Sequence, residues 1–557
     1  MNWIVSSDTI IFDPEFNQKL DIELISGYKI IIFSDYKLNE NLFEYYANNN
    51  FNNLKNKKSK FNQNVSNLHQ EITHLTFGYE FDQDVSNLPV GLTHLIFGYE
   101  FDQDVSNLPV GLTHLTFGYK FKQNTSKLPK SITHLTLYCS FIEYTLDLPQ
   151  TITHLIFNGW FWCNAGYLPR GITHLTFSGS LSGVYTNLWN LPPTITHLTF
   201  SDSFNEDVSY LPRTLTHLTF GKNFRRKVTN LPHGLTHLTF GYNFNQDVSE
   251  LPQTLTHLTF GAKFNRKVSK LPKNLTHLIF GNHYSCNLDV SKLPRTLTLI
   301  EFGTNFNKDI YNLPPALTHL TFCCYFNKEV SNFSRGITYL PKEITHLTFG
   351  WYFNKDVSIL PQKIKILTFG EYFNKDVSNL PPNITHLTFG TEFNKDVSKL
   401  PPNITHLTFG FSFNQDISVL PSTITHLTLG HKFNQKYNIP SNIKYLKLDC
   451  NNLHMIDSLP NSIVELNLGK KFNLEMNNLP TSIKKLIIDV NGCYNADLNC
   501  LPDYIEELQL NCDYKKRILH IPSNLKKIIC CENYAYMDDF VEIYDVDLYK
   551  HASNWWN

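Results

Sequence analysis

The stretch LPVGLTHLIFGYEFDQDVSN occupies residues 88–107, and LPVGLTHLTFGYKFKQNTSK follows it directly from residue 108. The second stretch repeats the first with few changes, and similar copies continue through most of the 557 residues. A globular protein of this length would need about three or four domains. No linker or change of composition falls where such domains would meet, and the repeat runs through those places. The sequence therefore predicts one open-ended stack of similar units.

Each copy contains a short alternating segment. In the first copy quoted above, Leu95 and Phe97 are placed to face inward, His94 faces outward, and Gly98 ends the pattern. Alternation with period two, rich in β-branched and aromatic residues, predicts a short β-strand. The segment DQDVSN after Phe101 predicts a turn, because Asp, Asn and Ser bond their own backbone. Stacked copies would pair their strands and bury the Leu and Phe residues in a continuous core.

The spacing within a copy is close to that of a leucine-rich repeat. Leu92, Leu95 and Phe97 match its LxxLxL part, but the next apolar residue, Phe101, falls later than in that pattern. We therefore predict a repeat solenoid that is leucine-rich-repeat-like and mostly β, with about 20 residues and one short parallel strand per coil. Counting strand cores from Phe77 to Cys530 gives 23 coils.

A Phe-Asn pair followed by Leu-Pro or Ile-Pro recurs, as in FNQDVSELP from Phe244 and FNQKYNIP from Phe433. This motif resembles the FNIP repeat, a family of social amoebae and of giant DNA viruses of amoebae. The resemblance is strong over residues 61–440 and weaker to residue 530. It implies a leucine-rich-repeat-like solenoid that binds other proteins. Members often begin with an F-box segment, for which this chain shows no counterpart, so a substrate-recognition role in a ubiquitin ligase is an alternative.

We expect four parts along the chain. They are an N-terminal cap with degenerate repeats (1–60), regular FNIP-type repeats (61–440), divergent leucine-rich-type repeats (441–531) and a C-terminal cap or tail (532–557). Thr9–Leu20 and Lys29–Leu42 align loosely with the repeat. Caps are expected because an open stack ends in an exposed sheet edge. Longer copies, with insertions near Trp189 and Tyr339, predict loops on one edge.

Charge and cysteine content narrow the function classes. The chain has 48 basic and 49 acidic side chains, a net charge of −1, and thus no basic field for nucleic acid or an anionic membrane. Its 11 cysteines, irregularly spaced, predict free thiols in a reducing compartment. The beginning lacks a signal-peptide pattern, and no stretch is long and apolar enough to span a bilayer. We expect a cytoplasmic protein, in the host cytoplasm if it is viral, that uses no cofactor.

Histidine shows the sharpest pattern. Sixteen of the 23 histidines occupy one slot of the repeat from His74 to His426, and Leu299 and Ile366 interrupt the series. Because adjacent strands lie about 4.8 Å apart, the imidazoles are expected to form a ladder on the strand face. Like charges at that spacing repel, so most rings should be neutral near pH 7, and acid would load one face with charge.

Catalysis and metal binding are disfavoured. A metal shared by two imidazoles needs further ligands, and no Cys or carboxylate column accompanies the histidines. The outward column beside them is mostly Thr, with Ile at 96, 156 and 279. No phosphate-binding loop, HExxH or GxSxG motif is present. We expect no enzyme activity and no metal site.

The sequence favours a non-enzymatic protein–protein interaction scaffold whose partner it does not name. The candidate surface combines the histidines of the ladder, aromatic residues of the variable edge, and the charged residues that replace histidine beyond residue 440. It comprises His94, His114, His217, His237, His257, His386, His406, Trp160, Trp189, Trp351, Tyr445, Glu465, Lys485, Glu507 and Lys527. Self-association through flat faces stays open. The alternatives are a weakly constrained repeat expansion and a pH- or metal-responsive histidine ladder.

Overall fold

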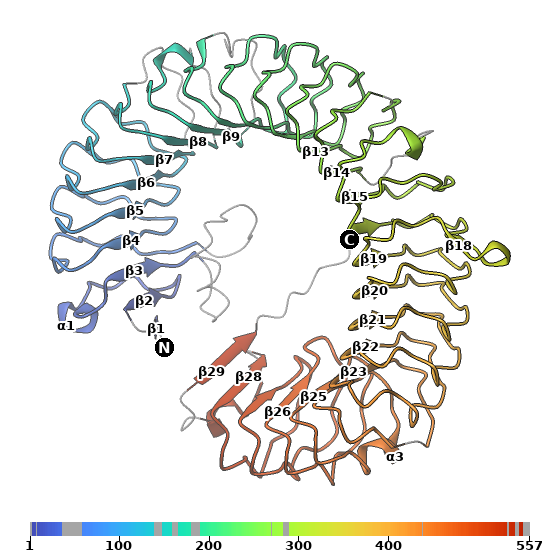
Figure 1. The fold of residues 1–557 in the computed structure, drawn as a ribbon. Helices are drawn as coiled ribbons and strands as arrows, with labels where there is room; N and C mark the ends of the chain where they lie inside the picture. Colours follow the sequence, from blue (N-terminus) through green and yellow to red (C-terminus); the bar gives the residue numbers. More distant parts are fainter. Residues whose placement is uncertain are drawn as a thin grey trace. The chain divides into compact units, whose positions relative to one another are not determined.

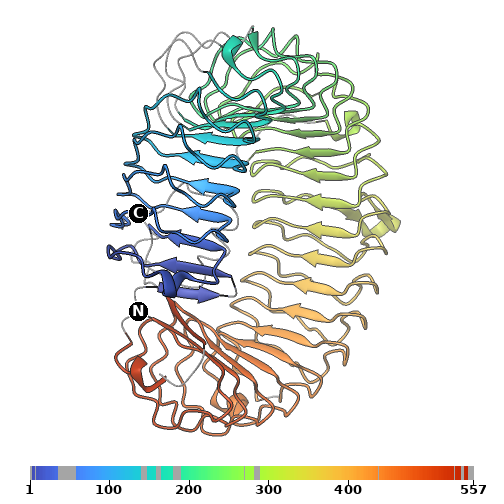
Figure 2. The same ribbon diagram turned by 90° about the vertical axis from the view of Figure 1, so that its left-hand side faces the viewer.

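The computed structural model describes residues 3–6, 8–35, 58–138, 147–158, 165–179, 190–268, 270–281, 289–436, 438–531, 534–540 and 545–549. Its contacts divide the chain into two compact units, residues 1–275 and 276–557. Each unit is a stack of coils with one short strand per coil. Within a unit the strands lie side by side along one face, and the turns form the opposite face (Figures 1 and 2). The predicted leucine-rich-repeat-like solenoid is confirmed.

In unit 1, β1 is antiparallel to β2, and from β2 onward each strand is parallel to the next in chain order. The elements are β1 (Trp3–Ser6), β2 (Thr9–Phe12), α1 (Ile22–Ile25), β3 (Ile30–Phe33), β4 (His74–Thr76), β5 (His94–Ile96), β6 (His114–Phe117), β7 (His134–Leu137), β8 (His154–Phe157), the 3-10 turn η1 (Ala165–Tyr167), β9 (His174–Phe177), β10 (His197–Thr199), β11 (His217–Thr219), β12 (His237–Thr239) and β13 (His257–Thr259).

In unit 2, the strands of successive coils are parallel throughout, and β17 and β18 form a separate antiparallel pair. The elements are β14 (His277–Ile279), η3 (Val290–Lys292), β15 (Leu299–Glu301), β16 (His319–Thr321), β17 (Ser331–Asn332), η4 (Phe333–Arg335), β18 (Ile337–Thr338), β19 (His346–Thr348), β20 (Ile366–Thr368), β21 (His386–Thr388), β22 (His406–Thr408), β23 (His426–Leu429), β24 (Tyr445–Leu448), α3 (Leu453–Ile456), β25 (Glu465–Leu468), β26 (Lys485–Ile488), β27 (Glu507–Gln509), β28 (Lys527–Cys531), η5 (Met537–Phe540) and β29 (Asp545–Tyr549).

The inward-facing residues form a continuous core. Leu92, Phe97 and Phe101 are each 2% exposed or less. The rings of Phe97 and Phe101 stack at 3.7 Å between centroids, and Phe97 lies 5.6 Å from Phe117 of the next coil. Full burial of such a side chain contributes about 1.5–3 kcal/mol. Because the two Phe positions recur in most of the regular coils, two aromatic columns run through much of each unit and account for the high Phe content.

A glycine ends the strand in most coils, and the close approach of the neighbouring coil explains it. A Cβ on Gly241 would lie 1.9 Å from the carbonyl oxygen of Gly221 in the preceding coil. A Cβ on Gly390 would lie 2.2 Å from the carbonyl oxygen of Gly370. At these two positions no side chain larger than hydrogen fits without moving the backbone, so the local coil spacing depends on the glycine.

The residue after the second Phe joins adjacent coils. The Oδ1 atom of Asn374 accepts a hydrogen bond from the backbone N–H of Asn394 at 3.0 Å. The N–H of Asn374 in turn donates to Oδ1 of Asn354. Asp102 does the same, since its Oδ1 accepts from the N–H of Lys122 at 2.8 Å. Only the acceptor oxygen is used, which explains why Asp and Asn exchange at this position.

The DVS segments form the predicted turns. In one copy, Oδ1 of Asp104 accepts from the N–H of Ser106 at 3.1 Å, and Oδ2 accepts from the Ser106 hydroxyl. These hydrogen bonds hold the pKa of the Asp104 carboxyl below its usual range. The same side-chain-to-backbone bond recurs at Asp247 and Asp396.

The sequence pattern predicted the structure of the chain ends and of the inserted segments only in part. The loosely aligned segments near the N-terminus contain β2 and β3, and β29 extends the sheet of unit 2 beyond residue 531. The insertion near Tyr339 forms the hairpin β17–β18, and the Tyr339 ring packs edge-on against Tyr311 with 4.6 Å between centroids. The insertion near Trp189 lies outside the described residues. The four-part division of the chain stays a prediction.

Candidate functional site

Parallel in-register pairing turns the histidine slot into a stack of rings in unit 1. Strand pairing places His94 beside His114 and Ile96 beside Thr116. Ten imidazoles, from His74 to His257, stack with 4.0–4.1 Å between neighbouring ring centroids. We call these ten residues the histidine ladder. The candidate residues His94, His114, His217, His237 and His257 all belong to it, and the rings are half-buried.

In unit 2 the histidine series is broken. Leu299 and Ile366 occupy the slot in β15 and β20, and their strands pair with the neighbouring strands in the same register. His386 and His406 stack at 4.1 Å, and the stack continues through His426 to Tyr445. The slot therefore accepts an aliphatic side chain without loss of strand pairing.

A threonine before each ladder histidine orients its ring. The Thr93 hydroxyl donates to the carbonyl oxygen of Thr73 at 3.0 Å and lies 2.9 Å from Nδ1 of His94. A hydroxyl has one proton, so we assign the proton of the neutral ring to Nδ1, which donates to the Thr93 oxygen. Nε2 then carries the lone pair. The same Thr-His pair recurs at Thr216 and His217.

Burial and mutual repulsion keep the ladder uncharged. Burial, followed by repulsion from His74, His114 and His134, lowers the pKa of His94 to about 4. Burial and ladder neighbours likewise lower the pKa of His217 to about 4. The neutral state at pH 7 expected from the sequence therefore has a physical basis in the packing.

Stacking also argues against chelation. Parallel rings direct their Nε2 lone pairs side by side, whereas ligands of one metal ion must converge on it. Turning a ring toward its neighbour would break its contact with threonine. Among the described residues, no group of three His, Cys, Asp or Glu side chains is placed to hold a metal ion.

Beyond residue 440 the same slot carries the charged residues that the sequence singled out. Strand pairing aligns Glu465, Lys485, Glu507 and Lys527 in one row. Lys485 Nζ lies 3.0 Å from a carboxylate oxygen of Glu507. We call the surface formed by this row and by the neighbouring row of Lys484, Glu506 and Lys526 the charged face.

The second row of the charged face is paired more tightly than the first. Glu506 lies between Lys484, at 3.0 Å, and Lys526, at 2.7 Å. Hydrogen bonds from Lys526 and Lys484 lower the pKa of Glu506 to about 2. Much of the charge on this surface is therefore neutralised within the protein, which leaves less of it for a partner.

Exposed aromatic residues gather in unit 2 in the segments that directly follow strands β16, β19 and β20 in the chain. Tyr325, Tyr352 and Tyr372 stack with 5.1 and 4.9 Å between centroids and are 49%, 39% and 48% exposed. Trp351, beside Tyr352, is 57% exposed. We call these four residues the aromatic edge. The other predicted tryptophans, Trp160 and Trp189, lie outside the described residues.

Several residues of these surfaces were missed from the sequence. The threonine before each ladder histidine was not recognised as its partner, although the pair Thr-His recurs in nearly every copy. The row of Lys484, Glu506 and Lys526 was also missed. Its signal was present, because the slot before the histidine slot changes from Thr to charged residues in the same coils.

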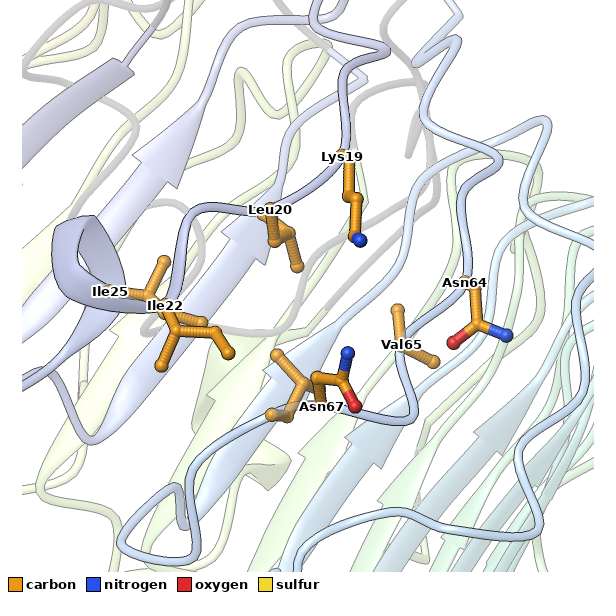
Figure 3. Close-up of a pocket in the computed structure, with 8 residues that line it drawn as sticks. Lys19, Leu20, Ile22, Ile25, Asn64, Val65 and Asn67 are labelled. Carbon is orange, nitrogen blue, oxygen red and sulfur yellow. The ribbon is translucent and has the colours of Figure 1, made fainter.

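A small notch lies beside α1 (Figure 3). Leu20, Ile22, Ile25 and Val65 line it together with the amides of Asn64 and Asn67. Lys19 is the one charged residue among its eight lining residues. The notch offers an apolar contact and no pair of groups for acid–base chemistry.

The one-strand coil, Leu and Phe core and in-register parallel sheet define a solenoid of the leucine-rich-repeat type. The FNIP repeat model matches residues 61–99, 84–120, 104–140, 189–223, 227–263, 247–283, 264–305, 284–325, 336–372, 356–390, 396–432, 433–471 and 455–490. These matches span more than half of the chain, which therefore belongs to the FNIP repeat family.

One solved structure supports the same architecture. The chain is similar to CroV588 of a giant virus, described as a novel circular LRR protein, with 32% identity and a TM-score of 0.69 over 98% of this chain and 80% of that one. YopM from Yersinia enterocolitica matches at 17% identity and a TM-score of 0.34 over 86% of this chain and 92% of that one. No curated protein matches the chain. None of the described helices has the length and apolar character needed to cross a membrane.

Proposed function

We propose that the protein is a non-enzymatic scaffold that binds another protein through the aromatic edge. The main support for this surface is that Trp351 is 57% exposed and stands beside three stacked, half-exposed tyrosines. Trp and Tyr are enriched among residues that dominate binding energy at protein interfaces. The fold itself is usually used for protein–protein interaction.

The tyrosine stack favours a protein partner over a sugar. Each ring face of Tyr352 is covered by a neighbouring tyrosine, so ring edges and hydroxyls are what the surface offers. Rings held in a stack also lose little conformational freedom when a partner docks, which lowers the cost of binding. The charged face is the second proposed contact surface, because its charges are largely paired within the protein. The histidine ladder is the third, because its surface is uniform along the stack.

The proposal places the protein in a reducing compartment, the cytoplasm of the host cell if it is viral. The described cysteines are free thiols, and Cys450 and Cys530 are buried among the core residues. Free thiols are typical of such compartments.

Affinity capture from the source cell, with the full chain as bait, tests the proposal. The variant Trp351→Ala combined with Tyr372→Ala should lose a partner that the unaltered chain retains. Tyr210→Ala is the control, because Tyr210 belongs to unit 1, is 59% exposed and is not one of the aromatic-edge residues. A partner captured equally by all three proteins would overturn the proposed surface.

The same experiment separates the alternatives. Capture of a ubiquitin-ligase adaptor would favour the substrate-recognition role, which no observation here singles out. Capture of nothing above the level of beads alone, by any of the proteins, would contradict the scaffold proposal and favour a weakly constrained repeat expansion.

A further inference from the structure

We propose that the histidine ladder makes unit 1 acid-labile, because protonation of the stacked rings forces like charges onto adjacent coils. This inference concerns the stability of the fold and does not depend on the proposed binding function. Its basis is geometric. Ten consecutive rings stack with 4.0–4.1 Å between neighbouring centroids. Every histidine-bearing strand of the ladder therefore lies next to at least one other histidine-bearing strand.

Among the described residues, few opposite charges act on the ladder rings. Asp8 acts on His74 at the start of the stack. On His94, His174 and His217, the charged groups that act are other ladder histidines. The flanking outward residues are Thr or Ile, which carry no charge. Charged residues other than histidine act in unit 2. Burial lowers the pKa of His426, and Glu465 offsets part of that effect. Burial also lowers the pKa of His346, and Lys365 adds to the lowering.

The rings cannot escape one another by turning. Nδ1 of each ladder histidine contacts the hydroxyl of the preceding threonine, so a proton added at Nε2 stays on the stacked ring. Protonation of every second ring would leave charges separated by twice the 4.0–4.1 Å between neighbouring ring centroids. Protonation of the remaining rings would halve that distance. The ladder should therefore take up protons over a broad pH range.

The direction of the pH effect follows from the lowered pKa values. The pKa of His134 and His174 in the folded protein is about 4, against 6.5 for an ordinary histidine. The unfolded chain then binds more protons than the folded one below pH 6.5. Stability is complete above that pH and falls as the pH drops from about 6.5 toward about 4.

Histidine NMR on the full, unaltered chain is the first test. Selectively labelled imidazole carbons should show ladder rings that titrate with midpoints below pH 5 and a Hill coefficient below 1, or unfolding before titration is complete. Independent titration of all histidines near pH 6.5 would overturn the proposal.

Thermal unfolding between pH 7.5 and 4.5 is the second test. The variant with His114, His154, His197 and His237 all changed to Leu removes every second inner ring, and the Leu299 coil shows that the slot accepts this side chain. The melting temperature of the variant should fall about half as far on acidification, because the ladder binds fewer excess protons on unfolding. His233→Leu, at an exposed site outside the ladder, should behave like the unaltered protein. Equal losses in all three proteins would contradict the proposal, and if the fourfold variant does not fold, the NMR titration decides alone.

Discussion

The hydroxyl oxygen of Thr216 lies 2.9 Å from Nδ1 of His217, its neighbour in the chain, and the same hydroxyl donates to the carbonyl oxygen of Thr196. One side chain thus links a ring of the histidine ladder to the backbone of the preceding coil. Because both contacts use the same hydroxyl group, its removal should affect ring orientation and coil packing together.

The first prediction concerns this hydroxyl. Thr216→Val should destabilise unit 1 by about 1 kcal/mol, since a hydrogen bond of this kind contributes about that much. The imidazole signal of His217 should also shift, because its Nδ1 partner is lost. Thr219→Val is the control, as the same slot holds Ile in other copies, for example at 96, 156 and 279. Urea unfolding and histidine NMR provide the measurements, and equal effects of the two substitutions would contradict the assigned role.

The second prediction concerns coil spacing. Gly241→Ala should destabilise the protein by about 1–3 kcal/mol, because its Cβ would overlap the carbonyl group of Gly221. Gly234→Ala is a matched control in the preceding turn, where the nearest atom is a carbonyl oxygen 3.6 Å away. That change should be neutral or slightly stabilising. Thermal unfolding of both variants checks the difference, and a neutral Gly241→Ala would show that the coils can separate freely.

The third prediction concerns the residue that joins coils through its side-chain oxygen. Asn374→Leu should leave the N–H of Asn394 without its acceptor and cost about 1–2 kcal/mol. Asn374→Asp keeps the acceptor, as Asp102 does in unit 1, and should be close to neutral. Amide hydrogen exchange at Asn394 is the direct measurement. Protection should drop in the Leu variant and persist in the Asp variant, and protection that survives in both would refute the bond's importance.

The fourth prediction concerns the charged face. Glu506→Gln should lower the thermal midpoint at pH 7, because the carboxylate is held between two lysines. The pKa of Glu506 is lowered to about 2, so its contribution is present above about pH 4.5 and disappears as the pH falls toward 2. The difference from the unaltered protein should shrink over that range.

High salt offers an independent check of the same effect. At 1 M salt the screening length is about 3 Å, so the difference between the Glu506→Gln variant and the unaltered protein should also shrink there. Glu250→Gln, at an exposed site in unit 1, should show little difference under any condition. A loss at Glu506 that is independent of both salt and pH would point to packing instead of charge.

The coil could be predicted from the sequence because its information is local. The alternation around Leu95, the turn at Asp104 and the recurrence of Phe101 each lie within one copy of the repeat. Identical copies pair identical residues, so the ring ladder also followed once the strand was recognised. The division into two units at residue 275 was not visible, since the repeat continues through that point without a break.

The candidate surfaces were less predictable. Glu465, Lys485, Glu507 and Lys527 were recognised as charged and variable, but the ion pair between Lys485 and Glu507 was not. Trp351 was recognised as an edge residue, whereas the tyrosine stack beside it depends on residues of three separate coils. Such contacts depend on side-chain direction as well as on spacing.

The sequence by itself determined the period, the strand and the residues that face the core, because a repeated pattern of apolar residues leaves one way to bury them. Only the tertiary structure decided which threonine orients each imidazole, which lysines neutralise Glu506 and which aromatic rings stay exposed. The lysine and tyrosine contacts join residues of different coils, and the threonine contact joins chain neighbours through a hydroxyl that is itself held by the preceding coil. All of them depend on side-chain directions and on distances of a few ångströms that the order of residues does not specify.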